Sequence, residues 1–316
     1  MVNQVQSVFA VERDLLDGSQ EMIKRPRKVQ MQGRAYTESQ QRKFNLLTKE
    51  MRLEVAACIK RDNWENANHM QELAQPVDTV YSRYVKRILD IVFSGIALII
   101  TFPVNFALLV GTALDVGSPI VFRQKRTGKD GKPFCLIKFR NMTNETDENG
   151  ELLPARDRVT KFGKFVRRAS LDELLNFWSI FKGDMSLVGP RPLKEETADR
   201  FSKRHAGRFA VRPGLECPIL GVTDHSPTWE ERLENDVWYV EHLSFSTDAR
   251  MLFGVVRMTL DSKARCYRAG AGGGGFMGYD EDGHVIDQAS IPEKYLDEVL
   301  QRHGLLKQAK EADFHA

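Results

Sequence analysis

Cysteine is scarce in this chain of 316 residues, and no two cysteines have the spacing of a metal-binding pair. The four that occur are widely separated and form no CxxC motif: Cys58, Cys135, Cys217 and Cys266. This scatter argues against a structural zinc site and against a disulfide framework, and it suits a reducing compartment.

An excess of charge of one sign is also missing, because the net charge is only +3. That value is too small to argue for nucleic acid, and the basic residues lack interleaved aromatic side chains, so we predict no nucleic-acid partner. Residues 1–30 are polar and mixed in charge, and we expect no cleavable signal peptide in them. The hydrophobic content of 42% is ordinary for a soluble fold, so any membrane contact must be local.

Long apolar runs are lacking except for residues 91–114. These 24 uncharged residues would reach roughly 36 Å as a straight helix, enough to span a bilayer. Pro103 lies near the middle, where it removes a backbone hydrogen bond and kinks a helix. Both flanks are basic and would prefer the cytoplasm, which a single span cannot satisfy. We therefore predict a re-entrant hairpin that enters and leaves by the same leaflet, with a buried helix pair of a soluble protein as the alternative.

Composition divides the chain into four stretches. Helical periodicity between residues 38 and 73 predicts helix before a break at Pro76, while the first 35 residues have the composition of a disordered segment. A glycine run at residues 269–276 lacks the strand and helix of a dinucleotide loop and is typical of a linker. The predicted regions are an accessory helical and partly disordered region (1–80), a re-entrant membrane helix (81–117), a further domain (118–262) and a C-terminal tail with a linker and a short helix (263–316).

The third stretch has the densest motif content. Two runs of mostly apolar residues, 120–124 and 134–139, flank a Gly-Lys-Asp-Gly turn at residues 128–131 and predict a β-hairpin. Further helices or turns are expected at residues 159–168, 228–243, 248–260 and 292–306.

Two adjacent carboxylates, Asp172 and Glu173, follow a short basic run. The spacing Ser170-x-x-Glu173 fits a capping box, in which both residues only begin a helix. The same position suits catalysis, because a positive helix end together with Arg167 and Arg168 would keep Asp172 ionised and receive a phosphate. An ionised carboxylate can attack phosphorus. The spacing alone leaves both interpretations open.

Further basic residues converge in sequence on this pair. Lys138 and Arg140 lie on one face of a predicted strand, and a loop punctuated by glycine and proline presents Arg191. Each feature alone is typical of a strand edge or a turn. Together they indicate a phosphate site in which Glu173 could hold Mg²⁺, since that ion takes few protein ligands and bridges to phosphates. With the apolar run upstream, this predicts phosphate chemistry on a lipid.

These motifs occur in the order found in a known family. The chain resembles the bacterial sugar transferases, which are monotopic polyprenyl-phosphate phosphoglycosyl transferases, over roughly residues 84–215. The matching features are KRILD (86–90), the apolar segment broken at Pro103, KFRNM (138–142), TKFGKFVR (160–167), SLDEL (170–174) and GDMSLVGPRPL (183–193).

The resemblance implies an α+β, mainly helical fold, with a re-entrant membrane helix hairpin and a compact catalytic domain that contains a small β-hairpin. It implies that Asp172 attacks the β-phosphate of a UDP-sugar, that UMP leaves, and that undecaprenyl phosphate takes the phosphosugar from the covalent intermediate. Mg²⁺ would be carried by Glu173. Phosphates would be bound by Lys138, Arg140, Arg167 and Arg191.

The resemblance also places the protein at the bacterial inner (cytoplasmic) membrane, in contact with membrane lipid, and makes residues 118–262 a cytoplasmic catalytic domain. There it would initiate exopolysaccharide, capsule or glycan biosynthesis. The alternative is a catalytically inactive, membrane-anchored scaffold for glycan-assembly enzymes. A homo-oligomer is a further open expectation, because membrane enzymes with extra helical arms often self-associate.

The chain departs from the family pattern at a few positions. Phe102 stands where serine often precedes the membrane proline, and Leu175 and Asn176 replace the usual proline and glutamine. Residues 216–218 read Glu-Cys-Pro where Thr-Gly and an aromatic residue are usual. These changes concern the C-terminal half of the expected site and the choice of sugar.

Overall fold

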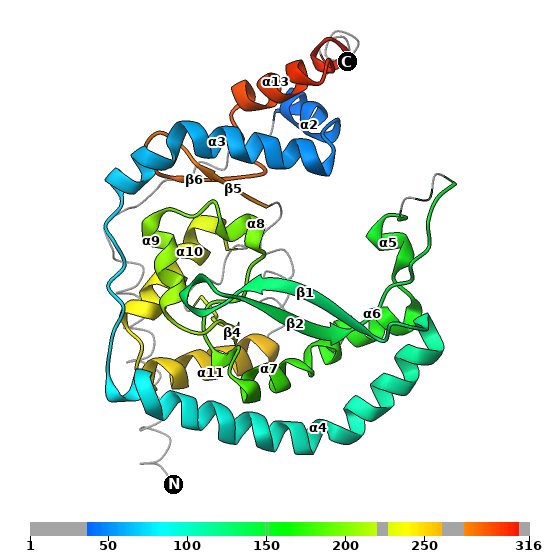
Figure 1. The fold of residues 1–316 in the computed structure, drawn as a ribbon, viewed down its shortest axis with the longest axis vertical. Coiled ribbons are helices and arrows are strands. Elements are labelled where there is room, and N and C mark those ends of the chain that lie inside the picture. The colour runs from blue at the N-terminus through cyan, green and yellow to red at the C-terminus, as the bar shows by residue number, and fades with distance from the viewer. Residues whose placement is uncertain (1–36, 149, 151, 220–226, 261–274, 310–316) are drawn as a thin grey trace, which may run out of the picture.

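The computed structural model describes residues 37–148, 150, 152–219, 227–260 and 275–309. The expected disorder at the N-terminus and most of the glycine-rich linker lie outside these residues. The described chain is mainly helical and contains three small two-stranded sheets, which confirms the coarse fold class (Figure 1).

The longest helix holds the apolar run. A π-helical turn, η1 (Tyr81–Val85), leads into α4 (Lys86–Val116), which is continuous over 31 residues and curves along the lower edge of the molecule (Figure 1). Only 11% of its most apolar window is buried, and side chains such as Ile99 and Phe102 are 76% and 67% exposed. The alternative of a buried helix pair is therefore wrong, because the segment is one helix and presents its apolar side chains outward.

Pro103 lies inside α4 without ending it. Local side chains supply polar contacts around the proline: Thr101 Oγ1 donates to the carbonyl of Ala97 at 2.7 Å, and Asn105 Nδ2 donates to Thr101 Oγ1 at 3.1 Å. A threonine bonded to the carbonyl four residues back tends to bend a helix, as a proline does. The structure contains a curved helix at this point, and a hairpin that re-enters one leaflet stays a prediction.

The predicted β-hairpin is confirmed. Strands β1 (Val121–Thr127) and β2 (Pro133–Phe139) pair antiparallel, and the turn between them includes Asp130 with a φ of 56°. After the hairpin come α5 (Ala155–Arg158), α6 (Lys161–Arg168), η3 (Leu171–Glu173) and α7 (Asn176–Lys182).

The rest of the predicted catalytic domain follows in sequence. Its elements are β3 (Ser186–Val188), α8 (Glu195–Ala198), α9 (Lys203–Ala206), η4 (Gly207–Ala210), β4 (Gly214–Glu216), α10 (Trp229–Glu241) and α11 (Phe245–Leu260). Strands β3 and β4 pair parallel, and a core that includes Val188, Tyr239 and Met251 joins them to α10 and α11. Helix α10 begins at a true capping box, in which Thr228 and Glu231 bond to each other's backbone N–H groups.

The two ends of the described chain pack together. Helices α2 (Glu38–Asn45) and α3 (Lys49–Met70) share a core with the hairpin β5 (Phe276–Tyr279) and β6 (Val285–Asp287) and with α13 (Glu293–Arg302). Ile59, Met277 and Leu296 are among its buried side chains. Figure 1 shows this unit, the terminal module, at the top of the molecule, on the side opposite α4.

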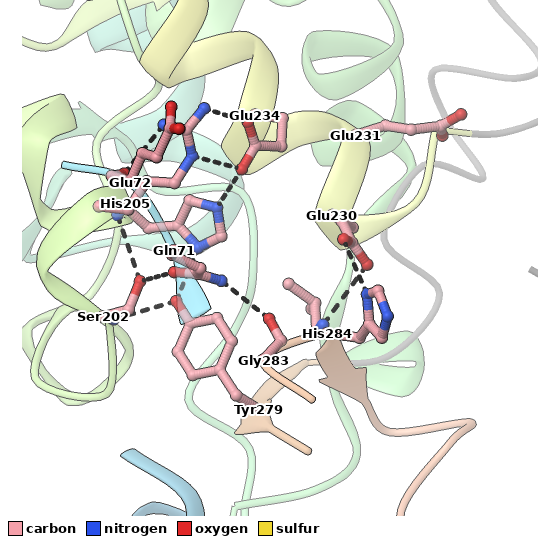
Figure 2. Close-up of polar contacts among 12 residues, drawn as sticks. Gln71, Glu72, Ser202, His205, Glu230, Glu231, Glu234, Tyr279, Gly283 and His284 are labelled. Carbon is pink, nitrogen blue, oxygen red and sulfur yellow. Dashed lines mark hydrogen bonds and ion pairs between the residues drawn. The ribbon is translucent and has the colours of Figure 1, made fainter. Parts of the chain in front are cut away.

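A polar network joins the terminal module to the catalytic region (Figure 2). Tyr279 Oη lies 2.7 Å from Nδ1 of the buried His205, whose Nε2 lies 3.0 Å from Glu234 Oε1. Ser202 donates to Gln71 Oε1 at 2.5 Å. Burial alone would raise the pKa of Glu234, but hydrogen bonds from Arg204 and His205 lower it to about 2. Tyr279 and Gln71 therefore tie the module to His205 and Ser202, while Glu234 holds the other side of the His205 ring.

Candidate active site

The carboxylate pair lies in the 3₁₀ turn η3, between α6 and α7. Ser170 takes the left-handed conformation, with a φ of 54°, and its side chain makes no capping bond. The backbone N–H of Ser170 instead bonds to the carbonyl of Arg167 at 3.0 Å and ends α6. The predicted capping box is therefore wrong, because Ser170 ends one helix before the next begins at Asn176.

Asp172 is 5% exposed and accepts a hydrogen bond from Asn141 Nδ2 on its Oδ2 atom at 3.2 Å. Asn141 lies two residues after the end of β2, so the hairpin and the η3 turn meet at this contact. Burial raises the pKa of Asp172 above its usual range, while the nearby Lys138 ammonium opposes the rise. Burial is therefore a larger influence on the pKa of this carboxyl than the charge of Arg167. That Asp172 is kept ionised stays a prediction.

Glu173 is held by Arg191. An Nη2 to Oε1 distance of 2.5 Å joins them, and Arg191 also donates to the carbonyl of Leu215 at 2.9 Å. Glu216 lies on the other side of the same guanidinium, with a 3.8 Å separation between Oε2 and Nη1. Arg191 therefore lies between a carboxylate of η3 and a carboxylate of β4.

Two glycines position the loop that carries Arg191. A Cβ atom at Gly189 would lie 2.7 Å from the carbonyl oxygen of Arg212, and one at Gly214 would lie 2.1 Å from the backbone nitrogen of Gly189. No side chain fits at either position, so only glycine allows β3 and β4 to approach this closely. This is the local reason for glycine in the Gly-Pro-Arg-Pro sequence.

The basic residues of β1, β2 and α6 surround the pair. Lys138 interacts electrostatically with both Asp172 and Glu173, and burial lowers its own pKa. The charge of Arg167 also reaches Asp172. Arg126 interacts with Glu173, and burial lowers its pKa as well. The structure thus brings Lys138, Arg167 and Arg191 to the carboxylates.

Arg140 lies elsewhere. It is buried, and its guanidinium donates to the carbonyl oxygens of Val116, Gly117 and Ser118 at the end of α4. These bonds satisfy helix-terminal acceptors and join α4 to the hairpin, which is a structural role. Binding of phosphate by Arg140 stays a prediction that this placement does not favour. Pro103 lies within the membrane-length helix, as described above.

Glu173 is the carboxylate of the site that suits a metal ion. Within the described ranges, no cluster of three or more His, Cys, Asp or Glu side chains could hold a metal ion. Magnesium needs no such cluster, because water and substrate phosphates supply most of its ligands. The Glu173 side chain is 29% exposed and Arg191 occupies only its Oε1 atom, so Oε2 fits this requirement.

Three residues of the site were not identified from the sequence: Asn141, Arg126 and Glu216. Asn141 lies within the KFRNM motif and Arg126 within the predicted hairpin, but the sequence assigned neither a role. Their approach to Asp172 and Glu173 depends on how the hairpin packs against η3. Glu216 was noted only as a departure from a family pattern. Its position next to Arg191 follows from the parallel pairing of β3 with β4.

Comparison with known proteins bears on this arrangement. Residues 81–262 match the sequence model of a family described as "Bacterial sugar transferase". The chain belongs to the bacterial sugar transferase family. The match includes α4, the hairpin, the carboxylate turn and the Arg191 loop, and it excludes the terminal module.

Relatives agree with the family assignment. The chain is 39% identical over 179 residues to the uncharacterized sugar transferase EpsL of Bacillus subtilis, an alignment that covers 57% of this chain and 89% of that protein. It is 31% identical over 201 residues to UDP-N-acetylgalactosamine-undecaprenyl-phosphate N-acetylgalactosaminephosphotransferase of Aeromonas hydrophila, covering 61% and 47% of the two chains.

A third relative is UDP-glucose:undecaprenyl-phosphate glucose-1-phosphate transferase of Klebsiella pneumoniae, which is 36% identical over 180 residues. That alignment covers 53% of this chain and 38% of the relative. The chain thus spans most of the Bacillus protein and less than half of the other two.

Proposed function

We propose that this sugar transferase moves a phosphosugar from a UDP-sugar to a polyprenyl phosphate, undecaprenyl phosphate in bacteria. One observation carries the proposal: a buried carboxylate, Asp172, lies among basic side chains in a domain attached to a long exposed apolar helix. Related proteins from Aeromonas and Klebsiella are named for this type of transfer to undecaprenyl phosphate. The product would initiate exopolysaccharide, capsule or other glycan assembly.

Asp172 is the proposed nucleophile. One of its carboxylate oxygens forms a bond to the β-phosphorus of the UDP-sugar, the bond from that phosphorus to the bridging oxygen breaks, and UMP leaves with the electron pair. An oxygen of polyprenyl phosphate then attacks the same phosphorus and releases Asp172 unchanged. Asn141 orients the carboxylate for the first step through its bond to Oδ2.

Charge around the carboxylates binds the phosphates in this proposal. Lys138, Arg167 and Arg191 supply positive charge close to Asp172, and Arg126 of β1 supplies it close to Glu173. Glu173 is the proposed Mg²⁺ ligand, and that ion would neutralise negative charge on the diphosphate when bound. Arg191 then has two roles, since it holds Glu173 in position and faces the same anionic substrate.

The exposed apolar side chains extend beyond α4. Phe165 of α6, Trp178 of α7 and Phe253 of α11 are also exposed, and Figure 1 shows these helices beside α4 on the lower side of the molecule. An apolar surface of this extent is typical of membrane contact. We therefore propose that this side rests on the inner membrane, with α4 re-entrant and the catalytic domain in the cytoplasm.

Cysteine labelling tests this topology. With the native cysteines replaced, single cysteines at Tyr84 and Ser118 are expected to react with a membrane-impermeant reagent in inside-out vesicles, and neither is expected to react in spheroplasts. Both basic flanks would then lie on the cytoplasmic side. Labelling of the two positions from opposite sides would establish a single span and contradict the re-entrant helix.

A panel of UDP-sugars tests the reaction. The full chain in detergent, with Mg²⁺ and polyprenyl phosphate, is expected to release UMP from at least one UDP-sugar and to form a lipid-linked product. Omission of Mg²⁺ should abolish the release. No UMP from any member of the panel would instead support the inactive membrane-anchored scaffold, in which the terminal module recruits other enzymes. The panel also identifies the sugar.

A further inference from the structure

A second basic cavity lies at the start of α4. It has a volume of about 380 Å³, within the range of small-ligand sites. Its walls come from the chain before α4, from the first turns of α4, from the β1–β2 turn and from the segment before β4. None of the residues assigned above to the transfer reaction lines it. Its basic lining residues are Arg83, Lys86, Arg87, Lys129 and Arg212.

Some of this charge is neutralised within the protein. Arg83 pairs with Asp78, and Lys86 pairs with Asp248 at 2.6 Å. The acidic residues that line the cavity are Asp78 and Asp90. Asp90 accepts hydrogen bonds from Ser186 Oγ and from the Leu187 backbone N–H, each at 3.0 Å. The other basic residues of the cavity, Arg87, Lys129 and Arg212, take no part in these pairs.

Arg87 and Arg212 meet at the end of α7. Arg87 donates to the carbonyls of Ile180 and Phe181 at 2.6 and 2.8 Å, and Arg212 Nε donates to that of Gly183 at 2.9 Å. A Cβ atom on Gly183 would lie 3.1 Å from Arg87 Nη2, so the two guanidinium groups adjoin the same residue. Their charges are close enough to repel each other.

Capping of α7 accounts for Arg87, because cations favour the carboxyl end of a helix. It does not account for the terminal nitrogens of Arg212 or for Lys129 on the exposed turn. Among the described residues, no ion pair joins a carboxylate to Arg87, Lys129 or Arg212, although the charge of the lining residue Asp90 reaches Arg87. Positive groups that line a cavity without a carboxylate partner favour an anionic ligand.

The location indicates the chemistry of that ligand. Arg87 lies in the first turn of α4, and Ile88 and Val92, in the same first turns, are 59% and 47% exposed. If α4 lies in the membrane as proposed, the cavity is at the depth of lipid phosphates, where arginine and lysine side chains bind headgroups. The transfer reaction is not needed for this argument. We propose that the cavity is a phosphate-binding site, separate from the site at Asp172.

Direct binding tests the proposal. The full chain in neutral detergent is titrated with inorganic phosphate and, separately, with dihexanoyl phosphatidic acid, and binding is followed by calorimetry. Arg212→Met is expected to weaken binding at least about tenfold, and Lys129→Glu about fivefold, because each removes a charged partner of the phosphate. Lys132→Glu, on the same turn but outside the cavity, should change affinity by less than about twofold.

Lys129 is exposed on a turn, so its variant remains informative if Arg212→Met fails to fold. Binding of the lipid at least about tenfold more tightly than inorganic phosphate assigns a lipid headgroup, and equal binding assigns a free phosphate; both outcomes support the site. The proposal is overturned if neither probe binds, or if Lys129→Glu binds both probes as tightly as Lys132→Glu does. UMP release from the same preparations reports separately on the transfer site.

Discussion

The Asp172→Asn variant is expected to release UMP at least about a thousandfold more slowly than the wild type, because an amide cannot displace UMP from phosphorus. The side chain is buried and its Oδ2 atom accepts a bond from Asn141, so the near-isosteric amide should fit the site with little change in packing. UMP formation in the presence of UDP-sugar, Mg²⁺ and polyprenyl phosphate measures the effect.

A second measurement separates covalent catalysis from binding. Wild-type protein incubated with the UDP-sugar and no lipid acceptor should gain the mass of one phosphosugar, and the peptide that contains residues 170–175 should carry it. Asp184→Asn, which changes a carboxylate near the end of α7, serves as a control and should retain both UMP release and the mass increase. Wild-type rates in the Asp172→Asn variant would contradict the covalent mechanism.

Features that depend on local sequence could be predicted. The length and apolarity of residues 91–114 predicted the one membrane-length helix of the described chain, and the glycine turn at residues 128–131 predicted the hairpin that carries Lys138. Both signals arise from neighbouring residues, so no distant contact is needed to interpret them.

Two segments have the spacing of a capping box, but only one of them forms it. Thr228-x-x-Glu231 forms the box and begins α10, whereas the same spacing at Ser170 does not. The difference lies in what precedes the serine: α6 ends directly before Ser170, which must take a left-handed conformation to turn the chain. A four-residue pattern contains no information about the helix in front of it.

Contacts between residues far apart in the sequence explain why the other features of the site were not predicted. The raised pKa of Asp172 results from burial beneath the hairpin, and Glu216 reaches Arg191 only through the pairing of β3 with β4. The core shared by α3 and α13 likewise joins residues that are more than two hundred positions apart, such as Asn63 and Tyr295. Such contacts have no signature in a single sequence.

Lys138→Met is expected to change the pH dependence of the transfer as well as its rate. Burial already raises the pKa of Asp172, and Lys138 is the main group that lowers it. Loss of that positive charge should raise the pKa of Asp172 further. Only the ionised carboxylate attacks phosphorus, so the acidic limb of the pH–rate profile should move to higher pH. At a fixed pH on that limb, the variant should then be slower than the wild type, because a smaller fraction of Asp172 is ionised.

The alkaline limb gives a second, independent signature of Lys138. Burial lowers the pKa of its ammonium group, so the wild-type enzyme should lose activity at high pH as Lys138 gives up its proton. Methionine has no proton to lose, and this limb should be absent from the variant. Profiles of UMP release from about pH 5.5 to 9.5 measure both limbs. Lys132→Met, on the exposed turn of the same hairpin, should keep the wild-type profile. A Lys138→Met profile that is lower at every pH but unchanged in shape would show that Lys138 does not control the ionisation of Asp172.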